Sequence, residues 1–280
     1  MKMRLGVDIG GTKIEAALVD EKGKIIKKVR KLTRASKGKK VVISNIISAI
    51  KELDYKKVKF IGISFPGIIN IKGVPVFAPN VKCLEGFNLK NFVVEKTGKK
   101  VLHDNDANCF AIAEHEFGSG KGYKDVIGLI IGTGLGAGVI IDNKIHRGKA
   151  IGGGELGHTI IDGKNTFMEL CCGPAIERRY KKYGGKIKNP LVSDIYDSKE
   201  PAARKTIKET MHYIGIGIAN IINTFDPEII VLGGGLSNLK FYNELKKEVK
   251  KHAIPELFKN IKIVKNKLGD SSGVIGAAFL

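Results

Sequence analysis

Two short polar stretches hold residue types that could act chemically. The first, HDNDAN at residues 103–108, brings two carboxylates and two amides together where an expected strand ends and a helix begins. Asp and Asn are preferred helix caps, but a cap needs only one such residue, and four Asp and Asn residues in six exceed that need. One Asp of this stretch is therefore a candidate general base for a hydroxyl proton, held in place by a neighbouring Asn. A purely capping cluster is the alternative interpretation.

The second stretch, GGGELGH at residues 152–158, carries Glu155 and His158 three positions apart. A zinc ion is the obvious alternative for this pair to bind, but a further pair of Cys or His residues at a suitable spacing is missing. The adjacent Cys171 and Cys172 could hardly both reach one ion with good geometry. A hydroxyl-rich ligand, held by a carboxylate and an imidazole, fits this pair better.

The turn in DIGGTK, residues 8–13, is suited to binding an anion. Its glycines let backbone N–H groups approach an anion without interference from a Cβ atom, and its threonine and lysine add a hydroxyl and a charge. Asp8 is an acid in an otherwise apolar strand, which indicates a metal ion or the water shell of one. The alternative is a plain hairpin in which Asp8 pairs with Lys13. The candidate anion-binding residues are Gly10, Gly11, Thr12 and Lys13.

An internal repeat duplicates this hairpin. Residues 5–20 and 127–142 match at a constant offset of 122, and each copy predicts a strand, a glycine turn, a second strand and a charged turn. A repeat at this distance predicts two similar domains that each open with a β-hairpin. The matched pairs are Gly6 with Gly128, Gly10 with Gly132, and Asp20 with Asp142.

The second copy contains GTGLGA at residues 132–137, which fits a dinucleotide-binding pattern by letter. That motif needs a helix directly after its glycines, because the pyrophosphate lies on the helix N-terminus. Here the β-branched run after Gly138 predicts a strand instead. We therefore interpret Thr133 and Gly134 as half of a phosphate clamp, with the turn at residues 10–13 as the other half.

The remaining pattern places these motifs on alternating strands and helices. The stretch EIIVLGGGLSN predicts a buried strand, three glycines and then a lysine-rich helix from about Lys240, which is typical of a nucleotide crevice. The other expected strands cover 5–9, 14–19, 25–29, 60–68 and a segment after GGGELGH. The other expected helices cover 42–53, the segment from HDNDAN to Gly118, roughly 199–224, and the final GDSSGVIGAAFL.

Composition limits the class of protein. The chain has 280 residues, 43% of them apolar and 27% charged, which is typical of a soluble globular protein with room for two domains. No uncharged run reaches the roughly 20 residues that a membrane span needs, and no signal core opens the chain. The four cysteines do not have the pattern of a disulfide-rich protein, so we expect the protein to be located in the cytoplasm. The formal charge of +20 is scattered over the chain, so we expect no nucleic-acid partner.

Together these stretches resemble the ROK family (repressors, open reading frames, kinases) of sugar kinases, within the actin-like ATPase superfamily. The match runs nearly from end to end. The stretches that carry it are DIGGTK, FPG, APN, NDAN, GTGLGAG, GGGELGH, DPEIIVLGGGLS and GDSSGVIGAA.

The resemblance implies a two-lobed α/β, ribonuclease H-like fold with duplicated β-hairpin-led domains. Its expected lobes are 1–108 and 109–269, with the final helix, about 270–280, packing back on the first lobe. It implies ATP-dependent phosphorylation of a hexose at the 6-hydroxyl by a homodimer, with Asp106 as general base and with Mg²⁺ held near Asp8 through water. The implied hexose contacts are Gly67, Asn80, Asn105, Asp106, Glu155, His158 and Glu169. The implied nucleotide contacts are Asp8, Gly10, Gly11, Thr12, Lys13, Thr133, Gly134, Gly234 and Gly235.

The sequence departs from the family pattern twice. Many members carry C-x-C-G-x-x-G-C-x-E after the histidine, whereas DGKNTFMELCCG here retains only Glu169 at the place of the last residue, so we expect no zinc site. The phosphate motif begins at Asp8, so we expect no N-terminal helix-turn-helix of the repressor branch. The alternatives within this reading are a kinase for N-acetylmannosamine or fructose, and a non-catalytic sugar sensor.

Overall fold

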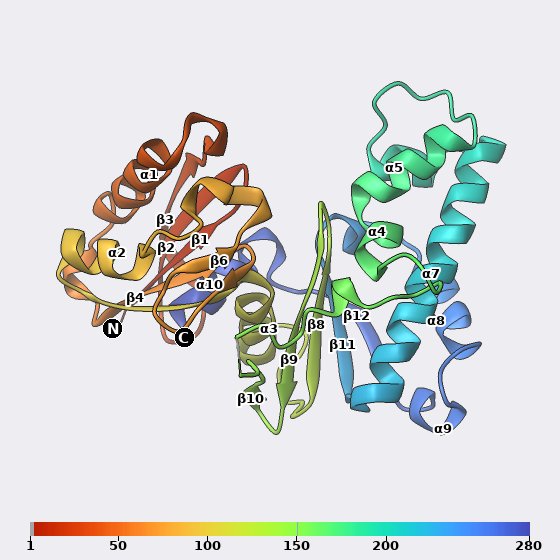
Figure 1. Cartoon of the computed structure of the whole chain (residues 1–280). Coiled ribbons are helices and arrows are strands. Elements are labelled where there is room, and N and C mark those ends of the chain that lie inside the picture. Colours follow the sequence, from red (N-terminus) through yellow and green to blue (C-terminus); the bar gives the residue numbers. More distant parts are fainter. Residues whose placement is uncertain (1–2, 150) are drawn as a thin grey trace.

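The computed structural model describes residues 3–149 and 151–280, which form two lobes with two helices between them (Figure 1). Each lobe contains a five-stranded mixed sheet. The first sheet has the spatial order β3 (Ile25–Leu32), β2 (Lys13–Val19), β1 (Arg4–Ile9), β4 (Phe60–Phe65), β7 (Lys100–Asn105). The second has the order β10 (Lys144–Ile145), β9 (Leu135–Ile141), β8 (Val126–Ile131), β11 (Ile229–Gly233), β12 (Lys262–Lys265). A small hairpin joins β5 (Ile68–Ile69) to β6 (Pro75–Phe77).

The two sheets have the same topology. In each, three antiparallel strands are followed by two strands parallel to the first strand of the hairpin. The expected duplicated α/β fold is therefore confirmed. The helices are α1 (Lys39–Lys51), α2 (Leu89–Thr97), α3 (Asp106–Phe117), α4 (Phe167–Cys171), α5 (Gly173–Lys182), α6 (Val192–Asp197), α7 (Pro201–Phe225), α8 (Tyr242–Lys250), α9 (Pro255–Phe258) and α10 (Ser272–Ala278).

The repeated glycines make room for the two central helices. Helix α10 packs on β1 and β4, while α3 packs on β8 and β9. A Cβ atom at Gly6 would clash with the Val274 carbonyl, and one at Gly128 would lie 2.9 Å from the Cβ of Ala111. The matched pair in the sequence repeat therefore has one physical cause, which is the close approach of a helix to the sheet.

Each lobe buries its own apolar core on the far side of its sheet. In the first lobe, α1 contributes Val42, Ile46 and Ile50 to a cluster with residues of β1 and β4. In the second, the long helix α7 lies in the largest cluster, together with α4, α5, α6 and α8. These separate cores explain how two similar sheets form two lobes rather than one.

The structure agrees with most of the expected elements but not all. The strand expected after GGGELGH is wrong, because Asp162 accepts hydrogen bonds from the backbone of Lys164 and Asn165 and turns the chain back, which leaves a single bridge between Ile160 and Thr166. A boundary after residue 108 would divide α3, which packs as one helix on the second sheet. Over the described residues, no helix is long and apolar enough to cross a membrane.

Candidate active site

Two cavities meet at the N-terminus of α3. The first has a volume of about 380 Å³ and the second about 350 Å³. Asp106 and Ile130 line both of them. A ligand in either cavity would therefore lie beside the Asp106 carboxylate.

Asp106 is held at this junction by the cap of its own helix. Asn105 is the N-cap of α3, and its Oδ1 accepts hydrogen bonds from the backbone N–H groups of Ala107 (2.8 Å) and Asn108 (3.3 Å). The Asn105 Nδ2 donates to the Gly67 carbonyl at 3.0 Å. Asn105 is the N-cap, while Asp106 lines both cavities and its Oδ1 also accepts a hydrogen bond from the Ala107 N–H at 2.9 Å. The capping interpretation of this stretch is thus correct for one residue of the four.

Asp104 stabilises the junction between β7 and α3. Its side chain is fully buried and accepts hydrogen bonds from Arg147 Nε at 2.6 Å and from Asn108 Nδ2 at 2.8 Å. Arg147 belongs to the loop that continues to Glu155. The pair therefore joins the loop of the second lobe to the end of β7, next to Asp106.

The site is acidic, and this changes the protonation of Asp106. Burial and the nearby carboxylates of Asp8 and Glu155 raise the pKa of Asp106 to about 7. Burial also raises the pKa of Asp8, although the Ser64 hydroxyl donates to its Oδ1 at 2.6 Å and opposes the rise. An aspartate with a pKa near neutrality is suited to accept a proton at physiological pH.

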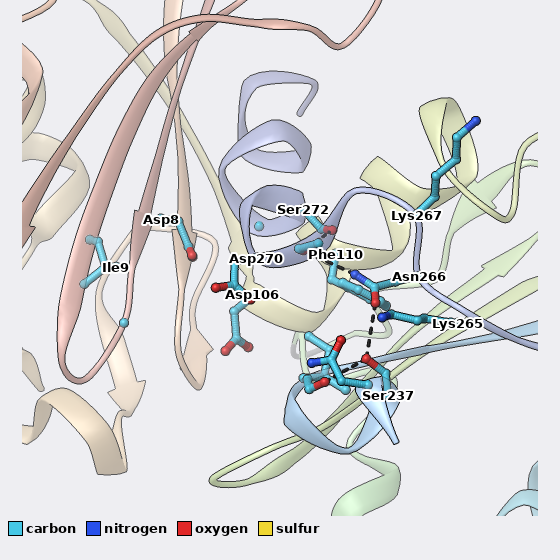
Figure 2. A pocket seen from close by; sticks show the side chains of 16 residues that line it. Asp8, Ile9, Asp106, Phe110, Ser237, Lys265, Asn266, Lys267, Asp270 and Ser272 are labelled. Carbon is cyan, nitrogen blue, oxygen red and sulfur yellow. Dashed lines mark hydrogen bonds between the residues drawn. The ribbon is translucent and has the colours of Figure 1, made fainter. Parts of the chain in front are cut away.

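The first cavity combines backbone groups, hydroxyls and cations. Figure 2 shows Asp8, Asp106 and Asp270 grouped near the first lobe, with Ser237 and other polar side chains of the second lobe across from them. Three residues of the implied nucleotide set line it, namely Asp8, Gly10 and Gly234. The residues that sequence reasoning did not single out are Ile9, Phe110, Ile130, Ser237, Asn238, Lys265, Asn266, Lys267, Gly269, Asp270, Ser272 and Gly273. Open glycine backbone, hydroxyls and ammonium groups are the groups that bind phosphates.

The second cavity gathers six of the seven implied hexose contacts. Its lining includes Gly67, Asn80, Asn105, Asp106, Glu155 and His158. The Phe77 ring lies edge-on to the His158 ring at a centroid distance of 6.2 Å. Carboxylate, amide and imidazole groups beside an aromatic ring suit a ligand with several hydroxyls and an apolar face.

Several candidates lie elsewhere than the sequence implied. Glu169 is exposed, and its carboxylate accepts hydrogen bonds from Thr166 at 2.9 Å in the capping box of α4 rather than lining the second cavity. Thr133 and Gly134 line the second cavity instead of the first. The Lys13 ammonium is paired with Asp270, whose Oδ2 lies 3.9 Å from the Lys13 Nζ, rather than with Asp8. The candidates outside the lining of both cavities are Gly11, Thr12, Lys13, Glu169 and Gly235.

Some of the missed residues had a signal in the sequence. Asp270, Ser272 and Gly273 lie in GDSSG, a capped helix start with the polar character of a binding loop. Ser237 and Asn238 follow the three-glycine run at the end of β11, one residue after its last glycine. Arg147 had no signal, because its partner Asp104 is 43 positions away in the chain.

The fold and the two cavities define a two-lobed phosphotransferase architecture, and comparison with known proteins gives the family. The model of the ROK family matches residues 4–280. A glucokinase of Thermotoga maritima is 31% identical over 304 residues, covering 99% of this chain and 96% of the relative. An N-acetyl-D-glucosamine kinase of Photobacterium profundum is 34% identical over 301 residues, covering 99% of each.

A solved structure agrees with these sequence relatives. The ROK family glucokinase from Streptomyces griseus, in complex with glucose and AMPPNP, has a TM-score of 0.85 and 29% identity, covering 99% of this chain and 98% of that one. The chain belongs to the ROK family. Its class of enzyme, an ATP-dependent sugar kinase, is confirmed by these relatives.

Proposed function

We propose that the protein transfers the terminal phosphoryl group of ATP to the 6-hydroxyl of a hexose, with Asp106 as the general base. The observation that carries this proposal is the place of Asp106, which lines both cavities at once. A hexose in the second cavity and a nucleotide in the first would meet at its carboxylate. The relatives named glucokinase support glucose as the first candidate substrate.

The residues of the site supply position and charge rather than a covalent step. Phosphoryl transfer passes through a loose transition state, so its catalysis depends on alignment and charge stabilisation. Glu155, His158 and Asn80 would hold the sugar, while Asp106 would orient the 6-hydroxyl and take its proton. The Lys265 ammonium and the backbone of Gly10 and Gly234 would stabilise negative charge on the phosphates.

The donor set of the first cavity fits Mg²⁺. Asp8, Asp106 and Asp270 all contribute carboxylates to this cavity. Mg²⁺ is bound in proteins through one or two carboxylates together with substrate phosphates and water. When bound, the ion would neutralise negative charge on the ATP phosphates. Asp8 is the residue that we assign to it, through a water molecule.

Several finer properties belong to the same proposal. An N-acetylhexosamine is the second candidate substrate, because a relative of equal coverage is named for N-acetyl-D-glucosamine. Fructose and N-acetylmannosamine are further alternatives. We also propose a homodimer in the cytoplasm that binds neither nucleic acid nor membrane, and a non-catalytic sugar sensor is the alternative from another class.

A coupled assay of ADP release tests this function. The purified chain is incubated with Mg²⁺, ATP and each of glucose, N-acetylglucosamine, N-acetylmannosamine and fructose, and binding of each sugar is measured in parallel. We expect sugar-dependent ADP release with glucose, and the product to be the 6-phosphate by NMR. Sugar binding without turnover on any member of the panel would establish the sensor and overturn the kinase.

A further inference from the structure

A cluster of metal-ligand side chains lies away from the two cavities. His212 on α7, Glu248 on α8 and His252 in the turn after α8 place one donor atom each within 4.8 Å of one another. None of the three lines either cavity. Figure 1 places α7 and α8 side by side on the opposite side of the second sheet from α3.

We propose that these three side chains bind one Zn²⁺ ion. Two imidazoles and one carboxylate form a common protein ligand set for zinc, with water completing the tetrahedron. The site would join α7 to α8 in the lobe that lacks the cysteine motif after His158. It differs from the expectation of no zinc site, which rested on that missing motif alone.

The spacing of the donor atoms supports one shared ion. His212 Nδ1 lies 3.7 Å from Glu248 Oε2, and zinc bonds of about 2.1 Å place tetrahedral ligand atoms about 3.4 Å apart. The rings of His212 and His252 have their centroids 5.4 Å apart. One nitrogen of His252 lies within 4.8 Å of the donor atoms of both His212 and Glu248.

Glu248 and His252 share one helix face. They are four residues apart, and the backbone N–H groups of His252 and Ala253 both donate to the Val249 carbonyl at 3.0 Å. The helical turn therefore continues past Lys250 to His252. Residues four apart lie above one another on a helix, so both side chains face His212 on α7.

One atom of the cluster lacks a hydrogen-bond partner, and its charged neighbour is the His212 ring, whose Nδ1 lies 3.7 Å away. Within the described part of the chain, Glu248 Oε2 is a buried oxygen with no hydrogen bond, whereas Oε1 of the same carboxylate accepts one from Lys251 Nζ at 2.5 Å. An unsatisfied buried carboxylate oxygen is costly, and a bound cation would remove that cost. The Lys251 side chain is 60% exposed, so its ammonium can move into water as the ion binds.

The backbone that carries the cluster is closely packed. A Cβ atom at Gly215, one turn after His212, would lie 2.7 Å from the Cβ of Glu248, so the absence of that atom lets α8 approach α7. Asn223 of α7 accepts a hydrogen bond from the Ile254 N–H at 2.9 Å and donates to the His252 carbonyl at 3.3 Å. The ligands are thus held near one another before any ion arrives, which lowers the entropic cost of binding.

Zinc titration of the tag-free, EDTA-treated chain tests this site. We expect one zinc per chain by elemental analysis after gel filtration, and a rise in Tm of about 5 °C at a hundredfold excess of Zn²⁺ over Kd. His212→Ala and the conservative Glu248→Gln should each weaken zinc binding at least about tenfold and remove the Tm rise. Sugar-dependent ADP release without added zinc should stay unchanged in both, because neither residue reaches the cavities.

His146→Ala is the matched control, because His146 is an exposed histidine of the same lobe outside the cluster. It should bind zinc as the unaltered chain does. The proposal is overturned if the unaltered chain holds less than about 0.1 zinc per chain after gel filtration. It is also overturned if His212→Ala and Glu248→Gln retain the affinity of His146→Ala.

Discussion

At the residue scale, the polar residues of the HDNDAN stretch have different roles. Asp104 anchors Arg147, Asn105 caps α3, Asn108 binds Asp104, and Asp106 faces the two cavities. The residue types predicted a site at this strand-to-helix junction. They did not predict Arg147 or the place of Thr133, since those contacts depend on how distant loops fold against each other.

The raised pKa of Asp106 makes a prediction about stability. The folded-state pKa is about 7 against an ordinary value of 3.8, so the folded protein holds this proton more tightly than the unfolded chain. The resulting stabilisation is fully present below pH 4 and is lost as the pH rises through about 7. Asparagine has no charge at any of these pH values. We therefore expect the Tm of Asp106→Asn, relative to the unaltered chain, to rise by several degrees between about pH 4 and pH 8.

Differential scanning fluorimetry at steps across this range measures the effect. Asp197→Asn, at the exposed end of α6, is the control and should show no such growth with pH. A Tm difference for Asp106→Asn that stays constant from pH 4 to pH 8 would contradict the raised pKa.

At the element scale, the spacing of apolar residues and the residue types typical of turns predicted most strands and helices. The strands β1, β2 and β3 and the helices α1, α3, α7 and α10 all coincide with expected segments. The expected strand after His158 failed because Ile160 has no core to bury it and remains 53% exposed. A local apolar run cannot reveal whether a neighbouring strand is available for pairing.

Glu114 of α3 makes a prediction at this scale. Its fully buried carboxylate accepts hydrogen bonds from the backbone of Ser119, Lys267 and Leu268 and from the Ser272 hydroxyl. Glu114→Ala would remove the acceptor of the three backbone N–H groups, at about 1–3 kcal/mol for each buried group, whereas the Ser272 hydroxyl keeps the Gly269 carbonyl as an acceptor. We expect the free energy of unfolding to fall by at least about 3 kcal/mol, measured by urea denaturation.

Glu116→Ala is the matched control, because Glu116 lies two residues further on α3 with an exposed side chain. Its loss should change the free energy of unfolding by no more than about 0.5 kcal/mol. Equal effects of the two substitutions would contradict the role given to Glu114.

At the scale of the whole molecule, the crossing of α3 and α10 joins the two lobes. A Cβ atom at Gly276 would clash with the Cys109 carbonyl, so the helices touch along their backbones. The sequence repeat predicted the two equal sheets, because the pattern of each hairpin is local. It did not predict this crossing, because Gly276 and Cys109 are brought together only by the tertiary fold. The homodimer stays a prediction, which a measurement of the molar mass in solution by light scattering would test.

The substitution Asp106→Asn tests the central claim, that Asp106 is the general base where the hexose and nucleotide cavities meet. Asparagine keeps the shape of the side chain but cannot accept the hydroxyl proton. We expect kcat for the best sugar to fall by about 10²–10⁴, while the Kd for that sugar, measured by calorimetry, changes only a few fold. A kcat near that of the unaltered chain would contradict the account.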